Sequence, residues 1–226
     1  MNTLLAKPWF AALPVCAVVV SAVLVRYRGT RGFFDWLVAE NHPVELATFA
    51  FLFLGSGIGL ALARRLRRRD LLASVFFFIF SAGLFVVAME EIAWGQQFLS
   101  FETPAWVLAW NAQKEFTLHN FEKLQGHSEF FRLAFAVPGL LAYAVCRRGV
   151  LRRLRPSLGL LPWLVVITVL AGIDGYADYY PTPTFVNDFT ARFSEVVELM
   201  IGVVGFLYVL DQNEKFRPCT RPLELS

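Results

Sequence analysis

Six runs of apolar residues, each close to the length needed to cross a lipid bilayer, constrain this chain more than any other feature. They lie at about 9–25, 45–63, 71–89, 130–146, 158–173 and 194–210. A helix needs roughly 20 apolar residues to cross the ~30 Å hydrocarbon core of a membrane. The composition agrees, because 57% of the 226 residues are hydrophobic and 23 are Phe. The sequence therefore predicts an all-α, polytopic membrane helical bundle of about six transmembrane helices, forming a single integral membrane domain over residues 1–226.

Lysine and arginine residues predict how these helices are oriented. Fourteen of the 21 lie before the first apolar run or after the second, fourth and sixth runs. Because cytoplasmic loops of membrane proteins are enriched in Lys and Arg, both termini are predicted to be cytoplasmic. The arginine runs after the second and fourth segments are interpreted as topology signals and as contacts with anionic lipids. Three Arg between positions 26 and 31 do not follow this pattern.

Acidic residues and histidines are distributed in the opposite way. Fourteen of the 18 acids and all three His fall in the predicted outer loops or at the outer ends of the helices. A polar, acidic layer is therefore expected at the extracytoplasmic surface of the membrane. Carboxylates at the end of a membrane segment are costly unless something uses them, so this layer is the candidate site.

Glu90 and Glu91 end the third apolar run as neighbours. Adjacent helical residues point about 100° apart, so one carboxylate is expected to face the bundle and the other the interface. Two carboxylates near the hydrocarbon boundary do not easily both stay ionised without a cation or hydrogen-bond donors. The pair suits a metal ligand or a general acid or base, and it equally suits structural acids bonded to Arg or to loop amides. Gln96 lies in the same polar segment and is a candidate to line the site.

The segment 104–124 predicts an amphipathic helix that lies in the membrane interface, opened by the helix-start signal Thr103-Pro104. Glu115 and His119 are four residues apart on it and therefore share a face. That spacing suits two ligands of one divalent ion. A Glu and a His placed in this way on a helix also often do no more than hydrogen-bond to each other.

Two further segments place acids in the same layer. Glu45 follows Pro43 at the start of the second apolar run, where the helix dipole also favours a carboxylate. Glu195 and Glu198 begin the last run three residues apart, with Ser194 as the expected cap. Glu198 lies one turn deeper than Glu195 and is the better functional candidate.

Several familiar motifs are missing from the chain. It contains no G-x-S-x-G, H-E-x-x-H, Walker A or G-x-G-x-x-G sequence, and no alternating basic and aromatic stripe that would suggest nucleic-acid binding. Three Cys lie far apart without a C-x-x-C pair, so neither a disulfide framework nor a zinc knuckle is predicted.

Three motifs together resemble those of a family of bacterial multi-pass inner-membrane proteins, whose members carry E-E-x2-W-G-Q, F-x-T-P and N-x-Q-x-E-x3-H-N. The chain reads E-E-I-A-W-G-Q at 90–96, F-E-T-P at 101–104 and N-A-Q-K-E-F-T-L-H-N at 111–120. The resemblance implies an inner-membrane location in a bacterium and brings no established activity or substrate. Members also typically carry E-D-x-P-V-E-W-x-T, where this chain reads E-N-H-P-V-E-L-A-T at 40–48, and E-E-I-S-W-G-Q-R at the first motif. The chain therefore departs from the usual pattern at Asn41, Leu46, Ala93 and Gln97.

Together these observations predict a polar pocket that opens to the periplasmic leaflet, in a metal-dependent hydrolase or transferase acting on a lipid or lipid-linked substrate. One divalent metal ion is expected to be held by Glu91, Glu115, His119 and Glu198. The residues expected to act in catalysis, with Glu90 or Glu45 as the general base, are Glu90, Glu45, Gln96, Asn111 and Asn120.

The alternative is a non-catalytic membrane protein, either an accessory or assembly subunit or a solute carrier, that binds through its acidic outer face. Membrane lipids are the expected partners in both cases. No binding of nucleic acid is expected, and a protein partner is left open.

Overall fold

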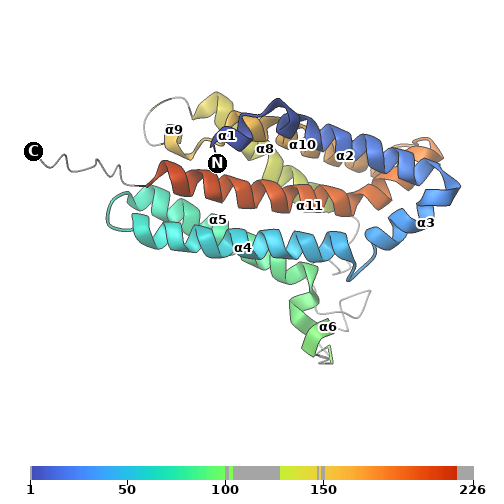
Figure 1. Cartoon of the computed structure of the whole chain (residues 1–226), viewed down its shortest axis with the longest axis horizontal. Coiled ribbons are helices and arrows are strands. Elements are labelled where there is room, and N and C mark those ends of the chain that lie inside the picture. Colours follow the sequence, from blue (N-terminus) through green and yellow to red (C-terminus); the bar gives the residue numbers. More distant parts are fainter. Residues whose placement is uncertain (1, 100–101, 104–127, 147, 149–150, 218–226) are drawn as a thin grey trace, which may run out of the picture.

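The computed structural model describes residues 2–99, 102–103, 128–146, 148 and 151–217, and within these ranges the chain is helical and contains no strand (Figure 1). The predicted all-α class is confirmed. The elements are α1 (Asn2–Leu5), α2 (Pro8–Arg26), α3 (Arg28–Leu37), α4 (Pro43–Leu66), α5 (Leu71–Glu91), the 3-10 turn η1 (Ala93–Gly95), α6 (Gln96–Leu99), α8 (Ser128–Val145), α9 (Leu151–Leu154), the 3-10 turn η2 (Leu158–Leu160), α10 (Leu161–Tyr179) and α11 (Thr184–Lys215).

Five helices in the described part of the chain are long and apolar enough to cross a membrane. They are α2, α4, α5, α10 together with the preceding η2, and α11, which supports a multi-pass membrane protein. α11 has 32 residues, so it is about 48 Å long and extends beyond a ~30 Å hydrocarbon core. The remaining predicted segment, 130–146, forms α8, which has 18 residues and carries Glu129 and Arg132 near its start.

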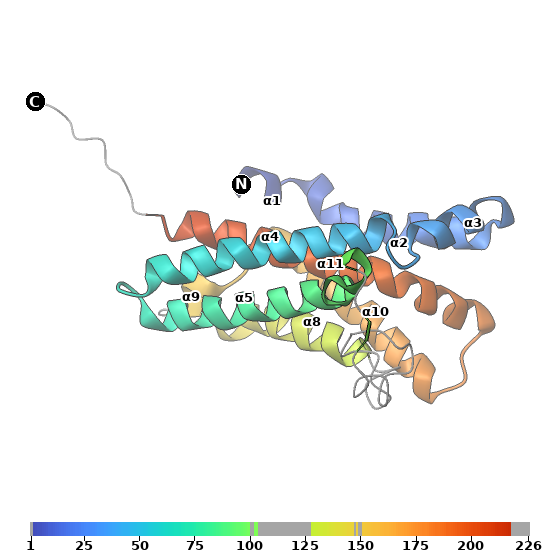
Figure 2. The same cartoon turned by 90° about the horizontal axis from the view of Figure 1, so that it is seen from below.

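The long helices run side by side along the long axis of the molecule (Figures 1 and 2). α11 lies at the centre of this bundle, because it contacts α4, α10, α8 and α2. α5 packs along α4 and also contacts α11 through Leu84, and α8 packs against α10. Ion pairs between charged residues of different helices are therefore expected to involve α11 in most cases.

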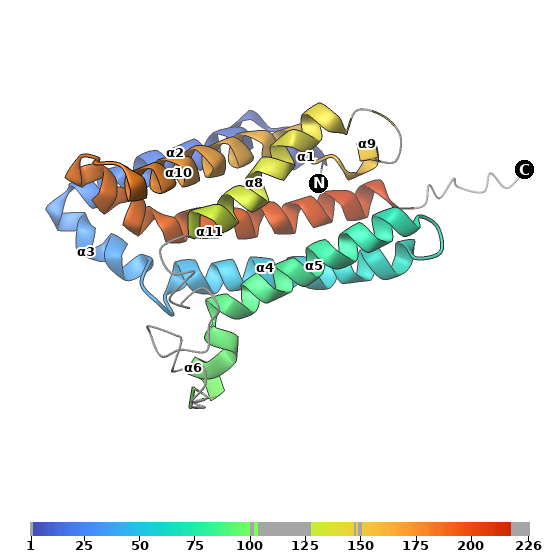
Figure 3. The same cartoon turned by 180° about the vertical axis from the view of Figure 1, so that it is seen from behind.

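Charged residues separate along the bundle axis. The turn between α4 and α5, the segment around α9 and the end of α11 lie at one end (Figure 1). We call this the basic end, because the arginines of 64–69 and 148–155 lie there. α3, α6 and the turn between α10 and α11 lie at the opposite end (Figures 1 and 3), which we call the acidic end.

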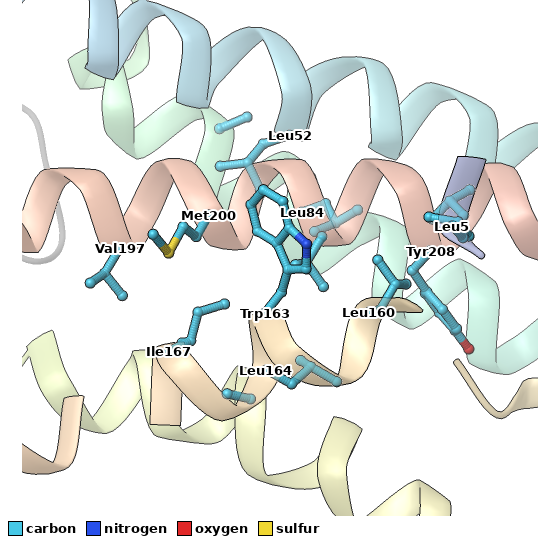
Figure 4. Packing of buried hydrophobic residues seen from close by; sticks show 14 of the residues in the cluster. Leu5, Leu52, Leu84, Leu160, Trp163, Leu164, Ile167, Val197, Met200 and Tyr208 are labelled. Carbon is cyan, nitrogen blue, oxygen red and sulfur yellow. The ribbon is translucent and has the colours of Figure 1, made fainter. Parts of the chain in front are cut away.

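Interlocking apolar side chains join α10 to α11 in the middle of the bundle (Figure 4). The Trp163 indole N–H also donates a hydrogen bond to the backbone oxygen of Phe10 at 3.2 Å, which attaches α2 to α10. The buried side chains that α10 and α11 contribute to this contact include Trp163, Leu164, Ile167, Val197 and Met200.

Close packing of α4 against α5 and α11 depends on Gly59. A Cβ atom added at Gly59 would lie 2.0 Å from Ser81 Oγ and 3.4 Å from Val209 Cγ1, whereas a Cβ added at Gly57 meets nothing within 4 Å. We expect Gly59→Leu to lower the free energy of unfolding by about 2–3 kcal/mol, because close-packed helices do not accommodate the added volume. Thermal denaturation in detergent measures this, with Gly57→Leu as the matched control. Equal melting temperatures for the two variants would contradict the contact.

The start of α11 differs from the sequence prediction. The helix begins at Thr184, after the N-cap residue Pro183, and not near 194. Ser194 is therefore not a helix cap: its Oγ donates to the backbone oxygen of Ala191 at 3.0 Å, inside the helix. Glu195 is consequently not a first-turn acid either, so the helix dipole does not account for its position.

The polar residues in the first turns of α11 are paired with α3, which lies outside the six predicted apolar runs. Arg192 Nε donates to Asp35 Oδ1 at 2.7 Å, and Arg31 Nη2 donates to Asp188 Oδ1 at 2.9 Å. Arg192 also pairs with Asp188 one turn earlier in α11. Arg31 of α3 thus lies at the acidic end because it forms an ion pair with Asp188 of α11.

Candidate functional site

Carboxylates from three helices gather at the acidic end of the bundle. Glu45 lies in the first turn of α4, Glu91 is the last residue of α5, and Glu195 and Glu198 lie in α11. The charges of Glu198, Glu195 and Glu45 all act on the carboxylate of Glu91. We call these four residues the carboxylate cluster. Like charges this close repel one another strongly where water is partly excluded.

Arg132 of α8 supplies positive charge to this cluster. Its Nη2 donates to Glu198 Oε1 at 2.9 Å, and its Nη1 donates to Asp174 Oδ2 of α10 at 2.8 Å. The Arg132 side chain is only 5% exposed, whereas those of Asp174 and Glu198 are 19% and 28% exposed. A buried guanidinium is tolerated when it is paired in this way. Arg132 therefore ties α8, α10 and α11 together and compensates two acids at once.

The end of α5 decides which of the two neighbouring glutamates faces the cluster. The chain turns sharply after Glu91, with positive φ angles at Ala93 (44°), Trp94 (55°) and Gly95 (83°). Such φ angles are uncommon for residues other than Gly. The Trp94 indole N–H donates to Glu90 Oε1 at 2.5 Å, four residues back. Glu90 is thus engaged with the turn, while Glu91 interacts with the carboxylate cluster.

Two other predicted catalytic residues are held by neighbours in the chain. The backbone N–H of Asn41 donates to the carboxylate of Glu45, which sits in the first turn of α4 after Pro43 as the sequence predicted. Gln96 Nε2 donates to Thr103 Oγ1 at 2.7 Å. Glu45 reaches the carboxylate cluster, whereas the hydrogen bond of Gln96 joins α6 to the segment that follows it.

Four predicted site residues lie outside the described residues, and so does the predicted interfacial helix at 104–124. They are Asn111, Glu115, His119 and Asn120. Of the four expected metal ligands, the structure brings together Glu91 and Glu198. Within the described ranges alone, no three side chains of His, Cys, Asp or Glu form a group that could hold a metal ion.

Arg132 is not among the predicted site residues, yet it pairs with two acids at this end of the bundle. The sequence does contain a feature that indicates this role, because an ionisable residue inside an apolar helix is functional or paired by default. Glu129, one turn earlier, is 2% exposed. A Cβ added at Gly175 of α10 would lie 3.0 Å from Glu129 Cγ, so α8 and α10 are in close contact here. The partners of Arg132 on α10 and α11 depend on that contact.

Comparison of the chain with protein-family models, with curated proteins and with solved structures found no match. The function is therefore inferred from the geometry and the charges of this chain alone.

Proposed function

We propose that the carboxylate cluster forms part of a divalent-cation site, and that the protein is a metal-dependent hydrolase or transferase acting on a lipid or lipid-linked substrate. The observation that carries the proposal is that α4 packs against both α5 and α11, which brings Glu45, Glu195 and Glu198 near enough for their charges to act on Glu91. Arg132 is the cation among the described residues that act on Glu91. The cluster contributes four carboxylates from three helices. Such a cluster favours binding of a cation, since carboxylate oxygens are the preferred ligands of hard divalent ions.

The proposal includes a membrane topology with α8 as the sixth transmembrane helix and both termini in the cytoplasm. The separation of charge supports it, because the basic end would then face the cytoplasm of a bacterium. The acidic end, with the carboxylate cluster, would open to the periplasmic leaflet of the inner membrane. Arg132 and Glu129 would lie at the outer end of α8, where paired charges are tolerated.

Two kinds of side chain would hold the cation in this proposal. Glu91 and Glu198 supply carboxylate oxygens, and Glu115 and His119 complete the set. Arg132 occupies Glu198 Oε1, so coordination by Glu198 falls to its other oxygen. A divalent ion bound there polarises a carbonyl or phosphoryl oxygen, or lowers the pKa of a bound water.

Proton transfer falls to a carboxylate beside the ligands. Glu45 is the better general base, because its carboxylate already acts on Glu91. Glu90 is the second choice, since its Oε1 accepts the hydrogen bond of Trp94. In the same proposal Gln96, together with the amides of Asn111 and Asn120, positions the substrate.

Metal content tests the proposal directly. We expect the protein purified in detergent without chelators to contain a divalent metal at nearly one ion per chain, measured by mass spectrometry. Glu91→Gln and His119→Ala remove ligands, so each is expected to lose most of the metal. Glu102→Gln removes the same charge from an exposed residue at the same end and is expected to keep it.

Thermal denaturation with and without a chelator provides a second test of the metal site. Chelation is expected to lower the melting temperature of the wild type, because metal that binds only the folded state stabilises it. Chelation is expected to leave the melting temperature of Glu91→Gln nearly unchanged. A wild type that contains no metal and gains no stability from added Zn²⁺, Mn²⁺ or Mg²⁺ would contradict the proposal.

The ion pairs of Arg132 favour a second candidate, a non-catalytic accessory subunit or solute carrier that binds through the acidic end. Arg132 already compensates Asp174 and Glu198 within the protein, which is what a structural role of these acids requires, and a partner or solute with positive charge would bind beside them at the acidic end. A metal-free protein that is stabilised by a cationic solute or by a basic partner would favour this candidate.

A further inference from the structure

A large cavity opens at the basic end of the bundle, between the turn from α4 to α5, the segment around α9 and the end of α11. Its volume is about 1,100 Å³. The acid among the described residues that line the cavity is Asp70. Asp70 caps α5, because Asp70 Oδ1 accepts a hydrogen bond from the backbone N–H of Ala73 at 3.0 Å. A cavity with this excess of positive charge attracts anions. Among the described residues that line it, those with positive charge are Arg69, Arg148, Arg152, Arg153, Arg155, Lys215 and Arg217.

An apolar cleft of about 560 Å³ adjoins this basic cavity. It lies between α5 and α8, which diverge toward the basic end with α11 behind them (Figure 3). Phe76 and Phe80 of α5 line it on one side, and Phe135 and Leu141 of α8 line it on the other. Its volume is within the usual ~300–1,000 Å³ of ligand pockets. Such a cleft between two membrane helices is suited to a hydrocarbon chain.

The segment around α9 forms the boundary between the cleft and the cavity. Leu151 and Leu154 line the apolar cleft, whereas Arg152 and Arg153 line the basic cavity. Pro156 lines both. A ligand that fills both spaces must therefore carry its anionic group next to an apolar chain.

Hydrogen bonds from α11 hold this boundary segment in place. The Tyr208 hydroxyl donates to the backbone oxygen of Leu154 at 2.7 Å. Gln212 Nε2 and Lys215 Nζ donate to the backbone oxygen of Arg155 at 3.1 Å and 3.2 Å. The arginines that line the cavity are therefore carried by a backbone that is already ordered, which lowers the entropy cost of binding.

We propose that the basic end binds one anionic diacyl phospholipid, with its phosphate in the basic cavity and one acyl chain in the apolar cleft. Guanidinium groups donate paired hydrogen bonds to phosphate oxygens, which suits Arg152 and Arg153 to the headgroup. A zwitterionic headgroup is disfavoured, because its ammonium group would enter a cavity rich in positive charge. The site is independent of the proposed metal site, which lies at the opposite end of the bundle.

The test compares phosphatidylglycerol with phosphatidylcholine of the same acyl chains, added to the full-length protein in detergent. Native mass spectrometry counts the bound lipid, and thermal denaturation measures the stabilisation. We expect one phosphatidylglycerol to bind each chain and to raise the melting temperature more than phosphatidylcholine does. The double variant Arg152→Gln/Arg153→Gln is expected to weaken phosphatidylglycerol binding at least about ten-fold, since each basic residue contributes to attraction of the anionic lipid. These two side chains are exposed, so the variant is expected to fold.

A second variant and a matched control complete the test. Ala142→Trp fills the apolar cleft and is expected to weaken lipid binding while leaving the basic cavity intact. Arg26→Gln/Arg28→Gln removes the same charge from exposed residues at the acidic end and is expected to bind phosphatidylglycerol as the wild type does. Equal binding of the two lipids would overturn the proposal. It would also be overturned if inorganic phosphate or glycerol phosphate stabilised the protein as much as the lipid did, because the ligand would then be a soluble phosphate.

Discussion

Replacing Arg132 with methionine is expected to lower the free energy of unfolding by about 3–5 kcal/mol, the largest effect of any single substitution considered for this protein. Arg132 is 5% exposed and donates to both Asp174 and Glu198, at 2.8 Å and 2.9 Å. Methionine retains an unbranched apolar stem but is shorter and uncharged, so it leaves two partly buried carboxylates without this cation. The same change also removes the tie between α8, α10 and α11. Unfolding in denaturing detergent, followed by circular dichroism, measures the loss.

The charge balance can be separated from the packing by removing all three charges together. The triple variant Arg132→Met/Asp174→Asn/Glu198→Gln removes all three charges, keeps the shapes of the two acidic side chains and has the same methionine at 132 as the single variant. It is expected to recover most of the lost stability, since breaking a buried ion pair costs more than replacing it with neutral groups. Arg28→Met changes an exposed arginine at the same end and is expected to have little effect. A triple variant as unstable as Arg132→Met would show that packing, and not charge, accounts for the loss.

Asp211 is the second residue whose replacement is expected to have a large effect. Its side chain is fully buried at the basic end, where its Oδ2 accepts the Ser157 hydroxyl at 2.6 Å and pairs with Lys215 Nζ at 2.6 Å. Asp211→Leu removes both contacts, so we expect a loss of about 2–3 kcal/mol in the free energy of unfolding. The loss should be smaller than for Arg132, because Lys215 is 32% exposed and water can replace part of its interaction. Thermal denaturation in detergent measures it.

A double-mutant cycle isolates the ion pair from the rest of this effect. Asp211→Asn and Lys215→Gln are expected to destabilise the protein separately, and the double variant is expected to lose less than the sum of the two losses. Strict additivity would mean that the two charges do not interact. Asp211→Leu is further expected to weaken phosphatidylglycerol binding, because Asp211 holds Ser157 and with it the segment that carries the arginines of the basic cavity.

The candidate site could be predicted from the sequence only in part. Glu45 was expected at the start of a helix and Glu91 at the end of another, and both are found there. The sequence could not indicate that Glu90 accepts a hydrogen bond from Trp94 while the charges of the other carboxylates act on Glu91. That difference depends on the turn at 93–95, where Trp94 adopts a positive φ and donates to Glu90. Local propensities do not favour such a conformation, so no pattern in the residues predicts it.

The residues at which helices begin could also be predicted from the sequence only in part. Pro43 marks the beginning of α4 correctly, because proline is favoured in the first helical turn and the residue before it is extended. The start of α11 was predicted ten residues too late, because Asp188 and Arg192 made its first turns look polar and exposed. Both side chains are in fact paired with Arg31 or Asp35 of α3. A polar helical segment is stable there only because another helix supplies its partners.

The sequence by itself determined the all-helical class, the long apolar helices and the separation of basic from acidic residues. These depend on the length of apolar runs and on the order of charges, which are local properties of the chain. Only the tertiary structure decided which charges meet. Arg132 lies far in the chain from Asp174 and Glu198, and α11 brings Glu198 near enough to Glu91 for the two charges to interact. Helices in a bundle pack through shape and small residues such as Gly59, and this packing sets which polar groups share one space.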